Sequence, residues 1–453
     1  MCMVLPAELI TSISGIRGVS PRVLSPAVVY AITFSFLKTL PPGKIVVSRD
    51  TRFSGYELKK AVLEACRDVG RGVLDADIVP LPSTQIAIKE YGAAGGIDIT
   101  ASHNPAEYNG LKLLNNEGVF IDEVHLGEVL NGLVEVEEKD VFTDACVFES
   151  IQEQAIEHHI QKVLDKAIEG RPLTIAVDAV NGAGSIIVPR LLERMNCKVI
   201  AIATDPTKPF PHIPEPLPEN LVWTQEQLRT VSFDVCVVVD PDADRLVLID
   251  ETGRILPEES TVPLVVQELI AQGKVGSVVV NMSTSRMVED VANASGVKVH
   301  RSRVGEKNVV DKMKQEGCFF GGEGGGGIID PDVHFGRDSL VGIVAIINLM
   351  RRTGKRVSEL YEALPHYEMR KDKITFSHKE KMPELYGALK ESLQGGVYNE
   401  EDGLRIKWGD LSWVHIRPSN TEPVVRVIGE AKTPERLGEM FDSVYEIIRK
   451  YQV

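Results

Sequence analysis

Cysteine is scarce in this 453-residue chain, and its six copies lie far apart with no Cys-x-x-Cys pair. That spacing excludes a disulfide framework and offers no ligand set for zinc, so we expect reduced, buried thiols in a cytoplasmic protein. The cysteines are Cys2, Cys66, Cys146, Cys197, Cys236 and Cys318.

Basic charge is also in short supply. The chain carries 50 lysines and arginines against 65 acidic residues, for a formal net charge of -15. This balance argues against a surface for nucleic acid or an anionic membrane, because either would need a basic patch. Any phosphate-bearing ligand must therefore be met by a few cations gathered in one place.

Long hydrophobic runs are absent as well. The most apolar stretch, residues 340–350, is too short to span a bilayer and predicts a buried helix. The first residues lack a basic segment followed by an apolar one, so we expect no secretory signal. A hydrophobic content of 43% still provides for a large core, and the length suggests roughly three domains of ~150 residues.

Strands alternate with helices over most of the chain. Ser25 and Pro26 open a helix as its cap and first residue. The strand and helix pattern restarts after an acidic stretch at residues 134–144, and again near Gly253. This order predicts an α/β architecture with mainly parallel sheets covered on both faces. From about residue 366 short strands follow closely, which predicts an antiparallel sheet in a smaller α+β domain.

A short predicted strand at residues 97–100 runs into a polar loop that holds Ser102 and His103. Asn109-Gly110 reads as a turn, after which Lys112 adds an ammonium group. On these residues alone, a structural loop in which Ser102 satisfies backbone donors is the simpler interpretation. A serine beside a histidine is no hydrolase signature, because the base must reach the hydroxyl in space rather than in sequence.

A second polar loop follows a mainly apolar predicted strand at residues 233–239 and reads Asp-Pro-Asp-Ala-Asp-Arg. Asp240, Asp242 and Asp244 alternate, so their carboxylates can converge on one hard cation such as Mg²⁺. A calcium EF-hand loop is the obvious alternative, but it needs glycine at its sixth position, where this chain has Arg245. The flanks also predict strands rather than helices, so the EF-hand interpretation fails.

Three further segments carry groups suited to a phosphate or a sugar. Gly15 and Gly18 bracket Arg17 in a tight polar turn. Residues 321–327 are all glycine except Glu323. Residues 417–423 combine an arginine, hydroxyls and an amide in a turn, which together can hold a phosphate. Taken alone, the three segments are more simply interpreted as a polar N-terminal turn, a flexible linker and an ordinary hairpin turn.

Two other patterns receive a structural interpretation. Gly182 and Gly184 precede a helix but lack the third glycine of a dinucleotide fingerprint, so we discount a nucleotide cofactor. Arg49 and Arg52 follow a strand and read as a solvated pair of salt bridges.

In order and spacing, these segments resemble those of the α-D-phosphohexomutases, the phosphoglucomutase/phosphomannomutase superfamily, over essentially the whole chain. The Thr-Ala-Ser-His-Asn-Pro string is similar to the family loop whose serine rests as a phosphate ester. The resemblance implies that Ser102 is the phosphoserine and that Lys112 transfers a proton beside it. It also implies that Asp240, Asp242 and Asp244 bind Mg²⁺ together with an oxygen of the serine phosphate.

The glycine-rich segment resembles the family's sugar-specificity loop, and residues 417–423 resemble its loop for the phosphate that is not transferred. Gly325 stands where serine or asparagine is usual in the family, and Gly327 where many members have histidine. For His334 a structural role is an equal alternative. We assign catalytic roles to Ser102, Lys112, Arg17, His103 and Arg245, and substrate binding to Glu323, Gly325, His334, Arg337, Arg417, Ser419, Asn420 and Thr421.

The resemblance implies three related βα domains and a smaller C-terminal α+β domain around a central cleft. We place the phosphoserine loop in residues 1–150, the metal loop in 151–253, the sugar loop in 254–366 and the C-terminal phosphate loop in 367–453. Independently of the resemblance, the first three loops each follow an apolar strand, and ligands of open α/β sheets gather at the carboxyl ends of strands. We expect the C-terminal domain to close about a hinge near residues 364–371.

The implied reaction interconverts a hexose 1-phosphate and a hexose 6-phosphate. Phosphorylated Ser102 donates to the free hydroxyl, the bisphosphate reorients, and its other phosphate returns to Ser102. The partners are then a phosphosugar and a hexose 1,6-bisphosphate that acts as intermediate and activator, with no nucleic acid and no membrane. Monomer and homodimer stay open. Lys112 as a general base needs a neutral amine, while nearby phosphates favour the ammonium.

The identity of the sugar is the part of the function that the sequence determines least. The Ser-Ile-Ser-Gly-Ile-Arg-Gly segment and the Gly-Glu-x-x-Gly-Gly loop resemble phosphoglucosamine mutases of the archaeal-type branch more than other members. A phosphomannomutase/phosphoglucomutase of broad specificity is the alternative. Two other classes are a non-catalytic sugar-phosphate sensor, which loss of Ser102 or Lys112 would favour, and a phosphatase with Asp240 as nucleophile.

Overall fold

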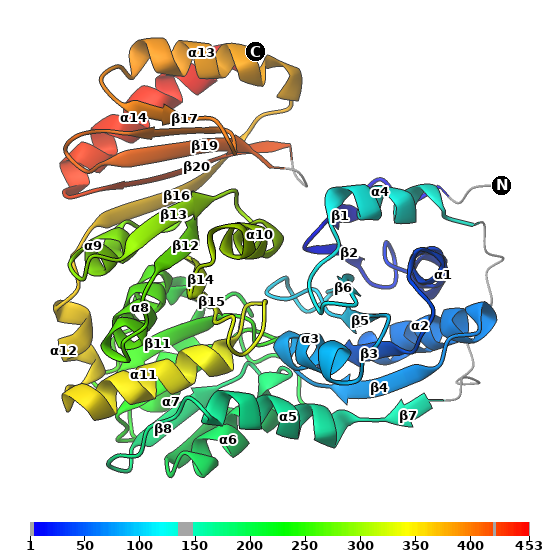
Figure 1. Cartoon of the computed structure of the whole chain (residues 1–453). Helices are drawn as coiled ribbons and strands as arrows, with labels where there is room; N and C mark the ends of the chain where they lie inside the picture. Colours follow the sequence, from blue (N-terminus) through cyan, green and yellow to red (C-terminus); the bar gives the residue numbers. More distant parts are fainter. Residues whose placement is uncertain (1–3, 135–147, 420–422, 453) are drawn as a thin grey trace.

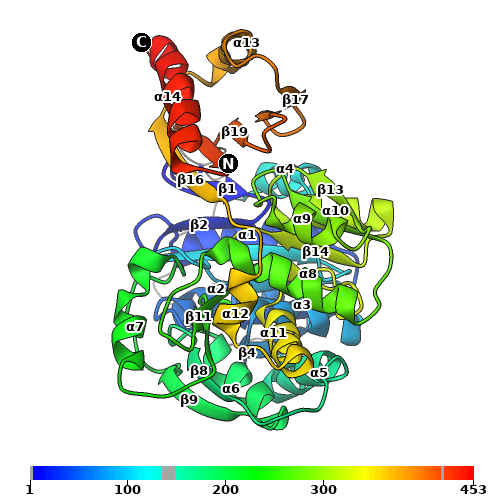
Figure 2. The same cartoon turned by 90° about the vertical axis from the view of Figure 1, so that its left-hand side faces the viewer.

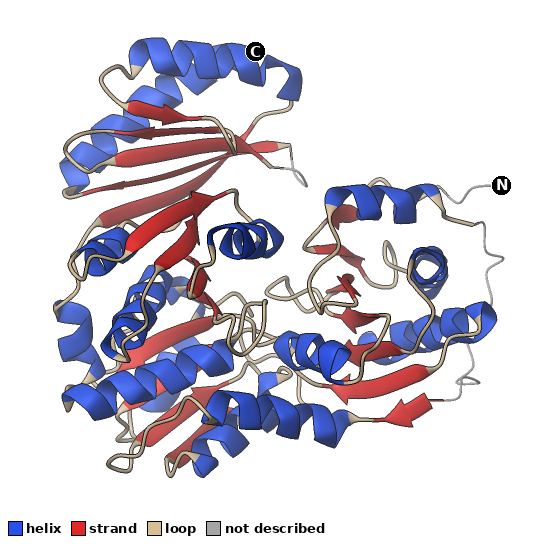
Figure 3. Ribbon diagram, viewed as in Figure 1, coloured by secondary structure: helices blue, strands red, loops and turns tan. Residues whose placement is uncertain are grey.

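The computed structural model describes residues 4–134, 148–419 and 423–452, which form four α/β domains in chain order (Figure 1). Each domain is built on its own sheet, and helices flank the sheets of the first three (Figure 3). The predicted α/β class with a smaller α+β domain at the C-terminal end is confirmed.

The first domain holds a seven-stranded mixed sheet in the order β1-β2-β6-β5-β3-β4-β7. Helices α1, α2 and α4 share one apolar cluster with one face of this sheet, and α3 belongs to the cluster on the other face. The elements are β1 (Ile10–Ser12), β2 (Gly15–Val19), α1 (Pro26–Thr39), β3 (Ile45–Arg49), α2 (Gly55–Val69), β4 (Val73–Ile78), α3 (Leu81–Glu90), β5 (Gly95–Ile99), β6 (Tyr108–Asn115), α4 (Glu123–Asn131) and β7 (Phe148–Ser150).

The second domain has a four-stranded sheet in the order β11-β10-β8-β9, parallel except for β11. Its elements are α5 (Gln152–Leu164), β8 (Thr174–Asp178), α6 (Gly184–Arg194), β9 (Lys198–Ala203), the 3₁₀ turn Pro218–Asn220, α7 (Val222–Leu228), β10 (Val235–Val239) and β11 (Leu246–Asp250). The proline-rich segment at residues 205–217 is irregular.

The third domain repeats this plan with the order β13-β12-β14-β15, in which β15 alone is antiparallel. Its elements are the 3₁₀ turn Glu258–Ser260, α8 (Thr261–Ala271), β12 (Ser277–Asn281), α9 (Met287–Asn293), β13 (Lys298–Ser302), α10 (Glu306–Glu316), β14 (Phe320–Glu323), β15 (Gly327–Ile329), α11 (Ser339–Thr353) and α12 (Val357–Glu362). Helix α11 is the predicted apolar helix.

The C-terminal domain is a five-stranded antiparallel sheet in the order β16-β20-β19-β18-β17, with α13 and α14 packed on one face. Figures 1 and 2 show it standing apart from the other domains as a separate lobe. Its elements are β16 (Glu368–Thr375), the 3₁₀ turn Lys379–Lys381, α13 (Met382–Ser392), β17 (Val397–Asn399), β18 (Leu404–Lys407), β19 (Trp413–Pro418), β20 (Val424–Ala431) and α14 (Pro434–Tyr451).

One apolar core runs through the first three domains. It includes Val46 of the first domain, Val177 and Val237 of the second, and Val278 and Phe320 of the third. The C-terminal domain has a core of its own. It meets the third domain through polar contacts, among them a 2.9 Å hydrogen bond between the Ser283 hydroxyl and His415 Nδ1. The first three domains thus form one block with a shared apolar core. The fourth domain is attached to this block through polar contacts.

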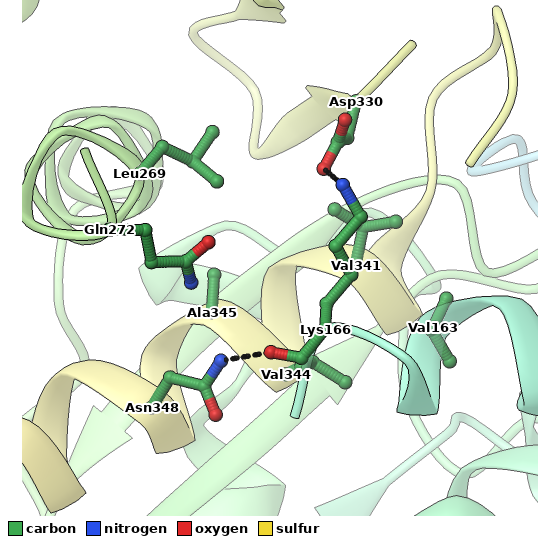
Figure 4. Close-up of a pocket in the computed structure, with 9 residues that line it drawn as sticks. All are labelled: Val163, Lys166, Leu269, Gln272, Asp330, Val341, Val344, Ala345 and Asn348. Carbon is green, nitrogen blue, oxygen red and sulfur yellow. Dashed lines mark hydrogen bonds and ion pairs between the residues drawn. The ribbon is translucent and has the colours of Figure 1, made fainter. Parts of the chain in front are cut away.

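A small, mainly apolar cavity with a few polar groups lies inside this block, between α5, α8 and α11 (Figure 4). The Lys166 ammonium lies 3.0 Å from an Asp330 carboxylate oxygen, and the Asn348 amide donates to the Lys166 carbonyl at 2.8 Å. The cavity volume of about 10 Å³ suits about one water molecule. It serves the junction between the second and third domains and is too small for a sugar.

Two local predictions are wrong. Asn109 and Gly110 do not form a turn; they lie inside β6, because β6 is sandwiched between β2 and β5 and the chain reverses earlier, at residues 102–107. The glycine-rich segment is not an open loop either, since most of it forms the tight hairpin β14–β15.

Other expectations are met where the structure describes them. The thiols of Cys66, Cys197, Cys236 and Cys318 are free and buried, whereas Cys2 and Cys146 lie outside the described residues. Within the described part of the chain, every helix is too short or too polar to cross a lipid bilayer.

Gly110 offers a test of the strand packing. A Cβ at this position would lie 2.6 Å from the Thr100 carbonyl oxygen and 2.8 Å from that of Ile16. Because both are backbone atoms of neighbouring strands, we expect Gly110→Ala to destabilise the protein by about 1–3 kcal/mol in urea unfolding. Gly127→Ala is the control, since Gly127 lies on α4 with open space around it. An equally stable Gly110→Ala would contradict the described packing.

Candidate active site

The loop after β5 presents Ser102 in a strained conformation. Its φ angle is +50°, which side-chain-bearing residues rarely adopt, and the residue is 1% exposed. The Thr100 hydroxyl accepts from the Ser102 amide at 2.9 Å. The Ser102 hydroxyl donates to Asp240 Oδ2 at 2.9 Å and lies 3.3 Å from His103 Nδ1. The serine therefore meets the aspartate loop of the second domain directly.

Arg52 holds this loop in place. Its guanidinium donates to the carbonyl oxygens of Ser102 at 2.5 Å, Asn104 at 2.7 Å and Pro105 at 2.8 Å, and to the Asp50 carboxylate at 3.0 Å. The Arg52 side chain is fully buried, so the predicted solvated pair with Arg49 is wrong for Arg52. A buried Arg bonded to successive carbonyls is a clamp, and it offsets the strain of the serine loop.

The loop between β10 and β11 gathers Asp240, Asp242 and Asp244 with all three side chains buried. One carboxylate oxygen from each lies within 4.8 Å of the others, and they are the only such group of metal-ligating side chains in residues 4–134, 148–419 and 423–452. Asp240 Oδ1 accepts from the amides of Asp244 and Arg245 at 3.1 and 3.2 Å. Oδ1 of Asp242 and Oδ1 of Asp244 are buried without a hydrogen-bond partner among the described residues.

Two orphaned carboxylate oxygens beside a third buried carboxylate suit a hard divalent cation. Burial, together with the charges of Asp242 and Asp244, raises the pKa of Asp240 well above its ordinary value. Such crowding is what an added cation relieves. The residues present therefore fit a metal site.

The discounted glycine segment supports this metal loop. A Cβ on Gly182 would lie 2.6 Å from Cα of Pro241, and the Ala183 amide donates to the Pro241 carbonyl at 2.8 Å. The glycine is needed because the two backbones touch. This contact could not be predicted from the sequence, because a glycine pair does not show which backbone will pack against it.

Lys112 reaches the metal loop from β6. Its ammonium lies 2.5 Å from Asp242 Oδ2 and 3.1 Å from Asp244 Oδ2, with the side chain 1% exposed. Burial works to lower the pKa of Lys112, but the carboxylates of Asp242 and Asp244 outweigh it and raise the pKa above its ordinary value. These contacts favour the ammonium form.

Arg17 and His103 flank the serine. Arg17 donates to Asn104 Oδ1 at 2.9 Å and to the Ser14 carbonyl at 3.1 Å, and burial lowers the pKa of its guanidinium to about 10. Burial, followed by the charges of Arg245 and Arg17, lowers the pKa of His103 well below its usual range. His103 is therefore a neutral imidazole at neutral pH.

Arg337 joins the metal loop to the predicted sugar loop. Its guanidinium donates to Asp244 Oδ2 at 2.6 Å, Glu323 Oε2 at 2.9 Å and Glu306 Oε2 at 3.1 Å. Burial works to raise the pKa of Asp244, but Arg337, Lys112 and Arg245 outweigh it and hold the pKa below its ordinary value. Glu306 was not foreseen from the sequence, because an isolated glutamate at the start of a helix carries no signal of its partner.

Gly325 and His334, two more of the predicted residues, lie in different surroundings. Gly325 faces Arg245, whose guanidinium would lie 3.5 Å from a Cβ on that glycine. His334 lies instead at a buried junction of three domains, where its Nε2 is 3.2 Å from Asp338 Oδ2, and His159 Nε2 is 2.8 Å from the same oxygen. The structural alternative for His334 has a concrete basis in these contacts.

The C-terminal loop contributes Arg417 and Ser419. Burial lowers the pKa of Arg417, whereas nearby carboxylates, Glu323 among them, raise it. Arg417 Nε has no hydrogen-bond partner among the described residues. Ser419 is buried at the end of the loop, and Asn420 and Thr421 lie outside the described residues.

Comparison with known proteins decides the family. Four family models match in succession, phosphoglucomutase/phosphomannomutase alpha/beta/alpha domains I, II and III at residues 9–139, 154–253 and 257–367 and the C-terminal domain at 370–447. The chain belongs to the phosphoglucomutase/phosphomannomutase family. It is therefore a phosphohexomutase, as the resemblance implied.

Individual relatives match the phosphohexomutase over nearly its full length. A phosphoglucomutase/phosphomannomutase of Thermococcus kodakarensis is 34% identical over 447 residues, covering 94% of this chain and 96% of the relative. A probable phosphoglucosamine mutase of Methanopyrus kandleri is 31% identical, covering 96% and 97%. A crystal structure of a family protein from Burkholderia thailandensis superposes with a TM-score of 0.84 at 23% identity, covering 99% and 98%, which shows the shared fold.

The contacts between Arg52 and the serine loop of this phosphohexomutase lead to a testable prediction. Arg52→Lys keeps the charge but cannot bond three carbonyls from one planar group, so the serine loop should lose its register with Asp240. We expect kcat to fall about 10–100-fold, the range for a misplaced reacting group. Arg49→Lys is the matched control, because Arg49 bonds Asp77 and the Asp50 carbonyl rather than the serine loop. Equal activities of the two variants would refute the clamp.

Proposed function

We propose that Ser102 carries the phosphoryl group that this phosphohexomutase exchanges with its sugar. The observation that supports it best is the Ser102 hydroxyl at 2.9 Å from Asp240, beside a buried carboxylate cluster with two orphaned oxygens. A nucleophilic oxygen next to a cation site is the arrangement that phosphoryl transfer needs.

Asp240, Asp242 and Asp244 are proposed to hold Mg²⁺. When bound, the ion would supply positive charge against the oxygens of the transferred phosphoryl group. Phosphoserine and phosphosugar each bring roughly -1.5 to -2 charges. The chain's own counter-charges are Lys112, Arg17 and Arg245, all within the site.

Lys112 is proposed to move the proton of the sugar hydroxyl. In its described contacts it is an ammonium, which stabilises developing charge and can donate a proton to a leaving oxygen. To accept a proton it must first lose one. A cation shared by Asp242 and Asp244 would weaken the attraction that holds the proton on Lys112. The general-base role assigned from the sequence therefore depends on the loaded site.

The distal phosphate is proposed to bind Arg417, Ser419, Asn420 and Thr421 of the C-terminal domain. A hexose 1,6-bisphosphate would then turn within the site and present its second phosphate to Ser102. Closure of the C-terminal domain about residues 364–371 would exclude water during that step. The Tyr367 hydroxyl in this segment donates to Asp290 at 2.5 Å, and Lys371 pairs with Glu258 at 2.8 Å. Both contacts hold the segment against the third domain. The domain limits at residues 150, 253 and 366 are part of the same proposal.

We propose glucosamine phosphate as the preferred substrate. Asp244, Glu323 and Glu306 surround the single guanidinium of Arg337. The Gln85 amide donates to Glu306 at 3.1 Å and leaves its own oxygen without a partner among the described residues. Three carboxylates thus face two cations, Arg337 and Lys112, beside the sugar loop. The excess negative charge favours a substrate that carries an ammonium. The 34% identical phosphoglucomutase/phosphomannomutase supports the broad-specificity alternative. Family membership leaves no support for the sensor and phosphatase readings.

Intact-mass analysis of the purified protein tests the phosphoserine. We expect a phosphate adduct that disappears in Ser102→Ala, along with mutase activity. Ser14→Ala is the control, because Ser14 lies nearby and contacts Arg17 only through its backbone carbonyl. An adduct that persists in Ser102→Ala would place the phosphate elsewhere.

Coupled assays on glucosamine, glucose and mannose 1-phosphates test the sugar. We expect the highest kcat/KM for glucosamine 1-phosphate. Glu306→Gln removes one negative charge while keeping the shape, so it should lower that preference over glucose 1-phosphate about tenfold, a typical value for one charged contact. Glu316→Gln, at the far exposed end of α10, should leave the ratio unchanged. A wild-type preference for mannose or glucose would favour the alternative.

A further inference from the structure

A buried carboxyl that the proposed reaction does not use lies beside Lys112. Asp98 on β5 is the direct cross-strand partner of Lys112 on β6 in the antiparallel pair. The two side chains therefore leave the same face of the sheet. Asp98 is 1% exposed and Lys112 is 0% exposed, so both lie in the protein interior, on the strands that border the serine loop.

Asp98 has few hydrogen-bond partners. The Ser48 hydroxyl donates to its Oδ1 at 2.9 Å, and the Thr84 hydroxyl donates to the Ser48 oxygen at 2.7 Å. The second oxygen, Oδ2, has no hydrogen-bond partner in the described part of the chain. A buried carboxylate with one hydroxyl donor and a bare oxygen is strongly destabilised, whereas a neutral carboxyl is not.

Three charged groups face Asp98, one positive and two negative. They are Lys112 from β6, Asp242 from the metal loop and Asp50 from the end of β3. Lys112 and Asp242 contact each other at 2.5 Å, and Asp50 pairs with Arg52 at 3.0 Å. Helix α3, the remaining element packed here, has only uncharged side chains along its buried length. Burial therefore dominates and raises the pKa of Asp98 to about 8.

We propose that Asp98 is a positioning residue that acts in its neutral form, and that its ionisation slows phosphoryl transfer at alkaline pH. The inference rests on the proposed roles of Ser102 and Lys112. A neutral carboxyl adds no charge behind the loop that receives a phosphoryl group. An ionised Asp98 adds a negative charge in the interior, where water does not screen it, and opposes the approach of phosphate to Ser102. The released proton goes to solvent.

The first test is the pH dependence of kcat in the full-length, Mg²⁺-loaded enzyme. Wild-type kcat should fall about tenfold per pH unit above the titration of Asp98, and Asp98→Asn, which cannot ionise, should lack this fall. Ser48→Ala removes the hydrogen bond that favours the carboxylate, so the fall should move to higher pH. Asp77→Asn is the control. Asp77 lies on the same sheet, but its carboxylate pairs with Arg49 and Lys59, so this variant should keep the wild-type profile. Superimposable profiles for wild type and Asp98→Asn overturn the proposal.

The second test does not depend on mutase activity. Because the folded protein raises the pKa of Asp98 above the unfolded value of ~4, the folded state binds more protons between the two values. Stability contributed by the neutral carboxyl is then lost as pH rises from ~4 to about 8. Over that window the unfolding equilibrium constant in urea should rise in wild type relative to Asp98→Asn, by up to about tenfold per pH unit.

The two measurements separate the possible failures. Equal pH slopes of stability in wild type and Asp98→Asn overturn the proposal, even if the variant is inactive. A second outcome is a clear slope difference together with a phosphate adduct that is still present in Ser102→Ala. Asp98 would then be neutral, but Ser102 would not carry the phosphoryl group. That outcome overturns the proposal because the proposed function on which it rests has failed.

Discussion

Mutual repulsion among three buried aspartates is the constraint around which the site is organised. Their oxygens lie within 4.8 Å of one another in an interior that screens charge poorly. Lys112 and Arg337 offset part of that charge, and each comes from a different domain than the aspartates themselves. The loop is thus stable only where three domains meet. The same residual negative charge that makes it costly would favour a divalent ion there, as the proposed function requires.

Backbone strain is concentrated at the same place. Ser102 and Ala243 both have φ near +50°, one on each side of the contact between serine and aspartate loops. Arg52 holds the first by its carbonyls, and Gly182 supports the second through close backbone packing. Neither support touches the Ser102 hydroxyl or the aspartate carboxylates. Their task is to keep two strained loops in register, which positioning-dependent phosphoryl transfer requires.

The sequence allowed good prediction where a residue type and its neighbours in the chain carry the chemistry. The alternating aspartates after an apolar strand and the helix opened by Ser25 and Pro26 belong to this class, because local pattern alone places them. The role of the serine loop came instead from its resemblance to the family. Arg52, Asp98 and Glu306 do not belong to this class, since each has a partner that is distant in the chain. Ser102 lies 50 positions from Arg52, Ser48 lies 50 from Asp98, and Gln85 lies 221 from Glu306. Asn109 and Gly110 misled for a related reason: a dipeptide typical of turns was drawn into a strand by pairing on both sides. Tertiary pairing overrode a local preference.

The division of the apolar cores has a consequence for how the molecule comes into being. The first three domains share one core, while the C-terminal domain closes around its own. During synthesis the shared core can be completed before residues 368–452 have left the ribosome, since domains generally fold as units from the N-terminal end. The nascent chain would then hold an assembled serine and aspartate pair before the C-terminal domain has formed. On the proposed function, the loop that retains a sugar bisphosphate would be added only with the last strands.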